Sequence, residues 1–284
     1  MLGTAVDTKL FRLLTHDRNL KTEEQIEAEA EEFASKGTYN PTDEDFRKFT
    51  QRSGGYFDWR GKRIVDLACG GGDLAIYLAM NGAEEAYGVD IQEHHIKLAD
   101  SAAEQMDVHN VKFICEDFHN WETTEKFDYV LTYEALDHIP NIGPTMQKMA
   151  SLLAPGGRII NFAAGFWKAP VGADHCDDFM RVHIPWTQLL FTDEARLTVR
   201  REKFRPNDPA TSFRDIRGGL SMYTYSEYKQ AISDAGLRIV EWDINYQLKY
   251  IRRGWLYRPF SAMLTRIPWL GEYFTFSVMS VLSK

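Results

Sequence analysis

The stretch Asp66-Leu67-Ala68-Cys69-Gly70-Gly71-Gly72-Asp73 decides the fold of this 284-residue chain. Its three consecutive glycines follow an apolar, strand-like run from Ile64 to Ala68. In a doubly wound sheet, the turn after the first strand meets the ligand at the carboxyl edge. Glycine lets the backbone turn sharply there, and lets a ligand approach without a Cβ in the way. The stretch therefore predicts a strand, a ligand-binding turn and the start of a helix.

Alternating strand and helix patterns continue outward from this turn. The pattern predicts strands at 63–67, 85–90, 111–115, 128–132 and 158–163, and helices at 73–80, 93–106 and 144–153. It resumes near the C-terminus with a helix at 224–235 and strands at 237–246 and 274–282. Such alternation predicts a mostly parallel sheet with helices on both faces.

The remaining segments predict an extension and two insertions around this α/β core. We expect an N-terminal helical extension or lid over 1–60, a core over 61–164, a cap insertion over 165–222 without a clear strand–helix unit, and a C-terminal completion over 223–284. In the extension, the capping box Thr22-Glu23-Glu24-Gln25 and the helix stop Gly37 predict one acidic, solvated helix. A long insertion in a compact domain is more often functional than idle.

Bulk composition narrows the class of protein. The net charge of −8 argues against a general attraction to nucleic acid. Three cysteines without CxxC spacing predict a reducing compartment, with neither a disulfide framework nor a zinc finger. The start of the chain lacks a signal-peptide pattern, and no run of about 18 apolar residues occurs. We therefore expect a cytoplasmic protein.

An acidic residue at the end of the second predicted strand indicates a nucleoside-containing cofactor. Asp90 lies 18 residues after Gly72 (90 − 72), where an acid commonly accepts hydrogen bonds from ribose hydroxyls. Gly70, Gly72 and Ala75 also fit the dinucleotide pattern GxGxxG/A, which leaves an NAD-dependent reductase open. Asp66 and Cys69 inside the motif, and the lack of a second βαβαβ half, argue against NAD.

The run from Val65 to Gly72 resembles motif I of the class I S-adenosylmethionine-dependent methyltransferases. Three later segments resemble the family in the same order, at 116–118, 133–138 and 152–157. The chain departs from the family at Ala68, where glycine is usual, and we expect the small alanine to be tolerated. The resemblance implies a doubly wound, seven-stranded, mostly parallel, Rossmann-like sheet whose last strand is antiparallel. It also implies that both insertions face the substrate.

The resemblance further implies a site for S-adenosylmethionine, with S-adenosylhomocysteine as the product. The residues that it places there are Asp66, Ala68, Gly70, Gly72, Asp90, Ile91, Asp117, Phe118, Tyr133 and His138. Methyl transfer is an in-line displacement, so the protein mainly aligns the acceptor with the S–CH3 bond.

A hydroxyl acceptor usually needs a general base, and histidine suits that role near neutral pH. His175 is the first candidate because acidic residues surround it, and His183 is the second. Local hydrogen bonding in a loop is the alternative role for both. The cluster Asp174/His175/Asp177/Asp178 has a divalent cation as a further alternative. We expect no metal.

The acceptor is predicted from the cap and from the placement of the insertions. The run Pro185–Phe191 and the placement of the insertions are loosely similar to bacterial methyltransferases of sugars and cell-surface glycans. We therefore expect O-methylation of a sugar, glycan or glycolipid-like hydroxyl. The alternatives are a natural-product O- or N-methyltransferase that acts by positioning alone, and a non-catalytic S-adenosylmethionine-binding protein.

The segment 248–271 combines aromatic residues with five basic and no acidic residues: Lys249, Arg252, Arg253, Arg258 and Arg266. That composition predicts peripheral membrane contact, or a site for a phosphorylated or lipid-linked acceptor. A basic face packed on the acidic body is the alternative. The oligomeric state stays open, with a homodimer through the N-terminal segment as one expectation.

Overall fold

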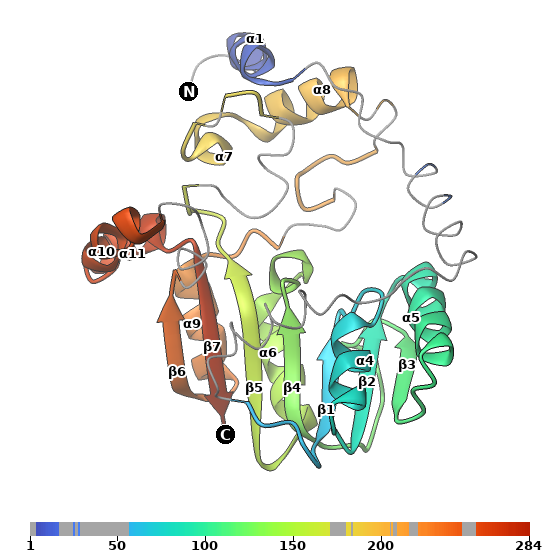
Figure 1. Cartoon of the computed structure of the whole chain (residues 1–284). Helices are drawn as coiled ribbons and strands as arrows, with labels where there is room; N and C mark the ends of the chain where they lie inside the picture. Colours follow the sequence, from blue (N-terminus) through green and yellow to red (C-terminus); the bar gives the residue numbers. More distant parts are fainter. Residues whose placement is uncertain are drawn as a thin grey trace.

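The computed structural model describes residues 4–16, 25, 28, 57–170, 180–182, 184–204, 206, 209–215, 221–245 and 254–284. Its strands are β1 (Arg63–Leu67), β2 (Glu85–Asp90), β3 (Val111–Cys115), β4 (Phe127–Tyr133), β5 (Leu153–Gly165), β6 (Arg238–Ile244) and β7 (Ser277–Ser283). They form one seven-stranded sheet in the order β3-β2-β1-β4-β5-β7-β6 (Figure 1). Strand β7 runs antiparallel to both of its neighbours, β5 and β6. The predicted fold class is confirmed.

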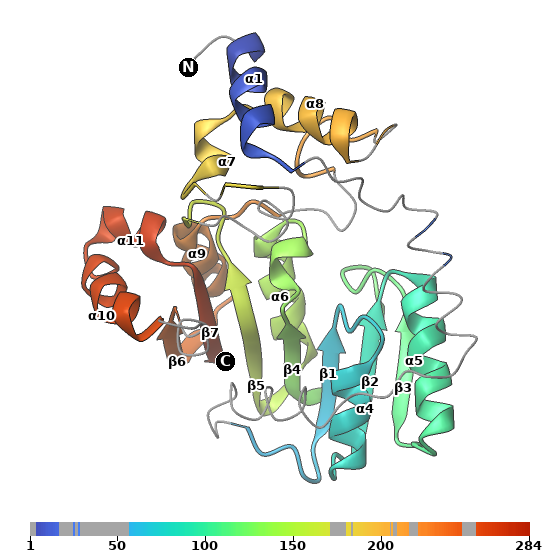
Figure 2. The same ribbon diagram turned by 45° about the horizontal axis from the view of Figure 1, so that its top comes forward.

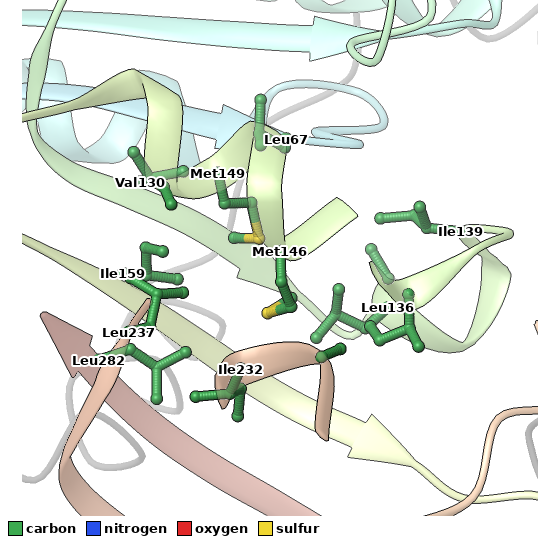
Figure 3. Close-up of a cluster of buried hydrophobic side chains, with 14 of the residues drawn as sticks. Leu67, Val130, Leu136, Ile139, Met146, Met149, Ile159, Ile232, Leu237 and Leu282 are labelled. Carbon is green, nitrogen blue, oxygen red and sulfur yellow. The ribbon is translucent and has the colours of Figure 1, made fainter. Parts of the chain in front are cut away.

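Helices cover both faces of the sheet. Helices α4 (Asp73–Met80) and α5 (Glu93–Gln105) lie on one face, and α6 (Ile142–Leu152) and α9 (Tyr225–Asp234) lie on the other (Figure 1). Successive side chains of β1 point to opposite faces of the sheet, so each face has its own hydrophobic core. Ile64 joins the cluster under α4, and Val65 joins the cluster under α6. Figure 3 shows the second cluster, in which Met146 and Met149 of α6 meet strand residues such as Val130 and Ile159.

A buried chain of polar side chains ties the C-terminal elements to the sheet. The Thr132 hydroxyl donates to the Asn161 side-chain oxygen Oδ1 at 2.9 Å, and the Asn161 side-chain nitrogen Nδ2 donates to the Tyr228 hydroxyl at 2.8 Å. The Tyr228 and Ser280 hydroxyls are 2.8 Å apart. Burial raises the pKa of Tyr228 to about 12, so this hydroxyl keeps its proton. The chain links β4, β5, α9 and β7 across the centre of the sheet.

A capping box begins helix α9. The Thr224 side chain accepts from the Glu227 amide at 3.3 Å, and the Glu227 carboxylate accepts from the Thr224 amide at 2.7 Å. We expect Thr224→Ala to lower the free energy of unfolding by about 1 kcal/mol, because it leaves a helix-end amide without its acceptor. Urea denaturation followed by circular dichroism measures the change. Thr224→Ser keeps the hydroxyl and should stay near wild type; an equal loss in both variants would contradict the capping role.

The segment 165–222, for which the sequence predicted no clear strand–helix unit, contains two helices among its described residues. Helices α7 (Thr187–Leu190) and α8 (Asp193–Lys203) occur there, and we call the described residues from Phe166 to Ser221 the cap. The inward face of α8 carries two buried arginines, Arg196 and Arg200, which hide its apolar periodicity. The Arg196 guanidinium lies 3.9 Å from the centroid of the Phe213 ring. Its contact with aromatic rings offsets part of the cost of burying the charge.

The N-terminal helix α1 (Thr4–Leu14) packs on the cap. Phe11 of α1 is fully buried in a cluster with cap residues that include Leu197, Phe204 and Phe213. The Arg12 side chain donates twice to the Glu202 carboxylate of α8, at 2.7 and 2.8 Å. Figure 2 shows α1 lying against α8 above the sheet. Of the helix predicted between Thr22 and Gly37, only residues 25 and 28 are among the described residues, and both are helical.

Two helices lie between β6 and β7. They are α10 (Gly254–Leu264), which lies in the basic and aromatic segment 248–271, and α11 (Pro268–Phe274), which begins in that segment and ends beyond it. Throughout the described ranges, every helix is too short or too polar to cross a membrane. Figure 2 shows α10 and α11 beside the outer strand β6 and below α7.

Candidate cofactor site

The loop after β1 has three left-handed residues within five positions. The φ angles are +58° at Ala68, +53° at Gly70 and +79° at Gly72. The Cys69 amide donates to the Val89 carbonyl oxygen at 3.2 Å, and the Gly72 amide donates to the Cys69 carbonyl oxygen at 3.0 Å. The loop is therefore bonded both to itself and to the neighbouring strand β2.

The glycines of this loop serve two different purposes. A Cβ at Gly72 would lie 2.6 Å from ring atoms of Phe113 and 2.7 Å from the Cβ of Ala99. Gly72 is therefore needed for close packing of the loop against α5 and β3. A Cβ at Gly70 would meet no atom within 4 Å. The backbone at Gly70 thus faces open space, where a ligand can approach it closely.

Ala68 occupies a left-handed position, where glycine is free of strain. A left-handed conformation costs an L-residue about 1–2 kcal/mol. The expectation that alanine is tolerated was based on its size, whereas the backbone angle of +58° is the quantity that matters. The strain lies at the turn that joins β1 to the glycines.

Asp90, the last residue of β2, connects the glycine loop to the next turn. Its carboxylate accepts from the Gly70 amide at 2.9 Å and from the Gln92 amide at 2.8 Å. The His95 ring nitrogen Nδ1 lies 3.4 Å from the same carboxylate. Burial alone would raise the pKa of Asp90, but the hydrogen bonds from His95, Gln92 and Gly70 outweigh it and leave the pKa lowered. Asp90 is therefore a fixed anion at the carboxyl edge of the sheet.

Asp66 is a buried acid with an unsatisfied oxygen. Asp66 is 3% exposed, and its Oδ1 atom makes no hydrogen bond to the described residues. Burial, followed by the charge of Asp90, raises the pKa of Asp66 to about 8. A buried polar atom without a partner is costly, so it points to a missing hydrogen-bond donor. A cofactor that brings an ammonium group to this loop would supply one.

The raised pKa of Asp66 predicts an unusual pH dependence of stability. The unfolded acid titrates near 3.8 and the folded acid near 8, so the folded state holds an extra proton between these values. The resulting stabilisation is present at low pH, and we expect it to decline by up to about 1.4 kcal/mol per pH unit as the pH rises toward 8. Asp66→Asn cannot lose that proton. Thermal unfolding at pH 5 and pH 8 should therefore show the variant gaining on wild type at the higher pH.

Two other groups at this loop carry raised pKa values. Burial raises the pKa of Cys69 well above its usual value, and the charges of Asp66 and Asp90 add to the effect. Cys69 is therefore a packed thiol and not a reactive thiolate. Burial raises the pKa of Asp73, the first residue of α4, to about 6, and its Oδ1 is also unpartnered among the described residues. Sequence analysis missed Asp73, although its place after the third glycine was a signal.

The turn after β3 holds Asp117 and Phe118. Oδ1 of Asp117 accepts from the His119 amide at 2.9 Å and lies 2.9 Å from the ring nitrogen Nδ1 of the same residue. Nε2 of His119 lies 2.9 Å from the Thr145 hydroxyl of α6. Phe118 is 6% exposed, and its ring stacks on His119 with centroids 4.2 Å apart. His119, which the sequence analysis missed, thus orients the predicted acid and fixes this turn to α6.

The predicted cofactor residues lie at one edge of the sheet. In the register of β1 and β4, Asp66 pairs with Leu131, so Tyr133 lies two residues further along at the same edge. His138 follows in a short 3-10 helix at Leu136–His138. Ile91, directly after Asp90, is 68% exposed, which suits an apolar contact with a flat ring. The open backbone at Gly70, the unpartnered oxygen of Asp66 and the exposed Ile91 fit a nucleoside cofactor with a cationic tail.

The two predicted base residues lie outside the described residues. His175 falls in the segment 171–179, together with the rest of the alternative metal cluster. His183 is also outside the described residues, although residues 182 and 184 on either side of it are described. Their role as base therefore stays a prediction.

Comparisons with known proteins find similarity to methyltransferases. Residues 59–180 match the family described as a methyltransferase domain. The chain is 33% identical to a ubiquinone biosynthesis O-methyltransferase of Coxiella burnetii over 123 residues, which is 41% of this chain and 51% of the relative. A relative with the same name from Aeromonas salmonicida is 33% identical over 129 residues, covering 45% of this chain and 52% of that protein. The chain thus spans about half the length of these curated relatives.

A solved structure gives the same fold. A S-adenosylmethionine-dependent methyltransferase from Clostridium acetobutylicum superposes with a TM-score of 0.51 at 14% identity, covering 83% of this chain and 88% of that chain. The family match therefore shows a methyltransferase domain over residues 59–180, and the superposition shows that the chain has the fold of S-adenosylmethionine-dependent methyltransferases. S-adenosylmethionine is the cofactor of that class.

Proposed function

We propose that this protein transfers the methyl group of S-adenosylmethionine to a hydroxyl oxygen. The observation that carries the proposal is the match of residues 59–180 to a methyltransferase domain. The choice of oxygen is supported by relatives that are named O-methyltransferases and are 33% identical over about half of their length. The reducing, cytoplasmic location predicted from the cysteines remains part of the proposal.

The residues at the carboxyl edge would hold the cofactor as follows. The unpartnered oxygen of Asp66 would accept from its ammonium group, and the carboxylate of Asp90 would accept from its ribose hydroxyls. Ile91 and Phe118 would contact the adenine ring. When bound, the sulfonium supplies an activated methyl group. The protein then contributes alignment of the acceptor, which can lower the barrier by roughly 7–11 kcal/mol.

The chemical identity of the acceptor is a separate part of the proposal. The sugar or glycan predicted from the sequence receives no support from the named relatives, which are described by ubiquinone biosynthesis. The domain match ends at residue 180, ahead of α7 and α8, so the cap that faces the acceptor in this family lies largely beyond it. We therefore propose a hydroxyl acceptor and leave its ring type to the assay below.

The proposal is tested in two stages. Calorimetric titration with S-adenosylmethionine and S-adenosylhomocysteine should give micromolar dissociation constants, and NADH should not bind. The protein is then incubated with methyl-labelled cofactor and three acceptor sets: phenols, sugars and amines. Label in a phenol or sugar ether supports O-methylation and identifies the ring type. Transfer to amines alone, or binding of NADH alone, would overturn the proposal.

A further inference from the structure

Helices α10 and α11 present an apolar surface to solvent. Five large side chains on these helices and their connecting turn are exposed, and we call them the hairpin face: Phe260, Met263, Ile267, Trp269 and Tyr273. Trp269 is 68% exposed, and Phe260 and Met263 are each 56% exposed. Single exposed apolar residues are normal on a protein surface, but several on neighbouring elements indicate an interaction site.

The hairpin face is held in place from behind. The buried Asn245, at the end of β6, donates to the Ser261 hydroxyl at 3.0 Å and to the Phe274 carbonyl oxygen at 2.9 Å. Its own side-chain oxygen accepts from the Phe276 amide at 2.6 Å. Within α11, Gly271 packs so closely on the preceding turn that an added Cβ would lie 3.2 Å from the Thr265 carbonyl oxygen. The face is therefore a fixed part of the fold.

The sequence that carries most of the hairpin face is basic. The segment 248–271 contains five basic residues and no acidic residue, in a chain whose net charge is −8. Arg266 is exposed between Met263 and Ile267. The nearest acid in the sequence, Glu272, turns inward, where its carboxylate accepts from the Ser226 amide at 2.8 Å and its side chain is 13% exposed. Among the described residues, Arg266 is thus an exposed basic side chain beside the apolar hairpin face, and Glu272 is turned away from solvent.

We propose that the hairpin face docks the protein on an anionic lipid surface. Trp and Tyr favour the headgroup region, aliphatic side chains favour the outer acyl region, and Arg attracts anionic headgroups. The hairpin face supplies the aromatic and aliphatic side chains, and the neighbouring Arg266 supplies the basic one. A symmetric dimer through this face would place two copies of the same basic segment against each other, whereas an anionic lipid surface offers the opposite charge, so the charge favours lipid over a second copy.

The hairpin is also joined to the cap. The Trp186 indole, directly before α7, donates to the Tyr273 carbonyl oxygen at 3.2 Å, and its ring meets Phe274 edge-on with centroids 5.4 Å apart. Docking would therefore bring the cap close to the membrane surface. An acceptor carried in or on the membrane could then reach the cap without crossing bulk water. Lipid docking itself needs no cofactor, so it can be tested independently of the proposed function.

The test is co-sedimentation of the full chain with vesicles. One set contains phosphatidylcholine alone, and the other contains three parts phosphatidylcholine to one part phosphatidylglycerol. We expect binding to the anionic vesicles at low salt and about tenfold weaker binding to the neutral ones. The double variant Phe260→Ser/Trp269→Ser should lose at least about tenfold in affinity for anionic vesicles. Met80→Ser is the matched control, because Met80 is 51% exposed at the far end of α4.

A charge variant and an assembly measurement complete the test. Arg266→Glu should weaken binding to anionic vesicles about tenfold and leave neutral vesicles unchanged. Circular dichroism verifies that each variant is folded. Absence of wild-type binding to anionic vesicles would overturn the proposal, and so would equal losses in Met80→Ser and the double variant. A wild-type dimer in sedimentation equilibrium that the double variant abolishes would also overturn it, by assigning the hairpin face to a second copy.

Discussion

Asp90→Ala is expected to weaken S-adenosylmethionine binding about 100-fold or more. Asp90 accepts hydrogen bonds from the amides of Gly70 and Gln92, so its loss frees the glycine loop from the end of β2. The variant also removes the acid expected to bind the ribose hydroxyls. Hydrogen bonds to a charged group contribute about 1.5–3 kcal/mol each, and losing two of them corresponds to a factor of about 100 or greater. Calorimetric titration of the variant with the cofactor measures the change.

Asp58→Ala is the matched control for this experiment. Asp58 is an exposed acid whose carboxylate pairs with the exposed Arg60 ahead of β1. Its removal should leave cofactor affinity near wild type, since an exposed ion pair of this kind contributes little. If Asp90→Ala bound the cofactor as tightly as Asp58→Ala does, the carboxyl end of β2 would not be part of the cofactor site.

Gly72→Ala is expected to destabilise the fold by about 2–5 kcal/mol. The estimate adds about 1–2 kcal/mol for a left-handed L-residue to about 1–3 kcal/mol for overpacking. Its Cβ would lie 2.6 Å from ring atoms of Phe113 and 2.7 Å from Ala99, so the rigid ring or helix α5 would have to move. Denaturant unfolding in the absence of cofactor measures the loss. At the upper end of this range, the variant would be partly unfolded at 37 °C.

Gly70→Ala separates packing from ligand binding in the same loop. Gly70 is also left-handed, but an added Cβ would meet no atom within 4 Å. The stability loss should therefore be near 1 kcal/mol, while the methyl group should occupy space meant for the cofactor and weaken its binding. The opposite pattern, with Gly70→Ala the less stable variant and still able to bind, would contradict the division of roles between the two glycines.

Sequence reasoning located the central sheet well because its signals are local. The strand predicted at 63–67 and the helix predicted at 73–80 match β1 and α4 residue for residue. Buried parallel strands are short apolar runs, and glycine or capping residues mark their ends. The strand predicted at 158–163 is longer in the structure, because β5 begins at Leu153, where its pairing with Phe127 shifts register. No residue pattern signals a bulge that depends on a partner strand.

The cap was not predictable in the same way. Helix α8 buries Arg196 and Arg200 on its inner face, so a search for apolar periodicity passes over it. Helix α1 needs α8 as its packing surface, and the pair Arg12–Glu202 is separated by 190 positions. Helices α10 and α11 lie in a segment whose mixture of basic and aromatic residues resembles a loop. In each case tertiary contact, and not local propensity, determines the helix.

At the candidate site, the side chains at strand ends were predictable from the sequence, and the side chains placed by turn geometry were not. The acids Asp66, Asp90 and Asp117 could be predicted because each lies at or just beyond the carboxyl end of a strand. The histidines that orient two of them, His95 and His119, were missed, although each lies within five positions of its acid. Such a partner becomes evident only when the turn geometry is known. The predicted base residues His175 and His183 lie outside the described residues and stay predictions.

The packing of α1 on α8 has a consequence for the order of folding. During synthesis at about 5–20 residues per second, the partner of Arg12, 190 positions later, emerges roughly 10–40 s after it. An isolated helix of 11 residues is marginal in water, so α1 has no stable conformation of its own during that interval. The first element of the chain is thus expected to be among the last to become ordered, and ribosome-bound intermediates should remain sensitive to protease near Phe11 until α8 is complete.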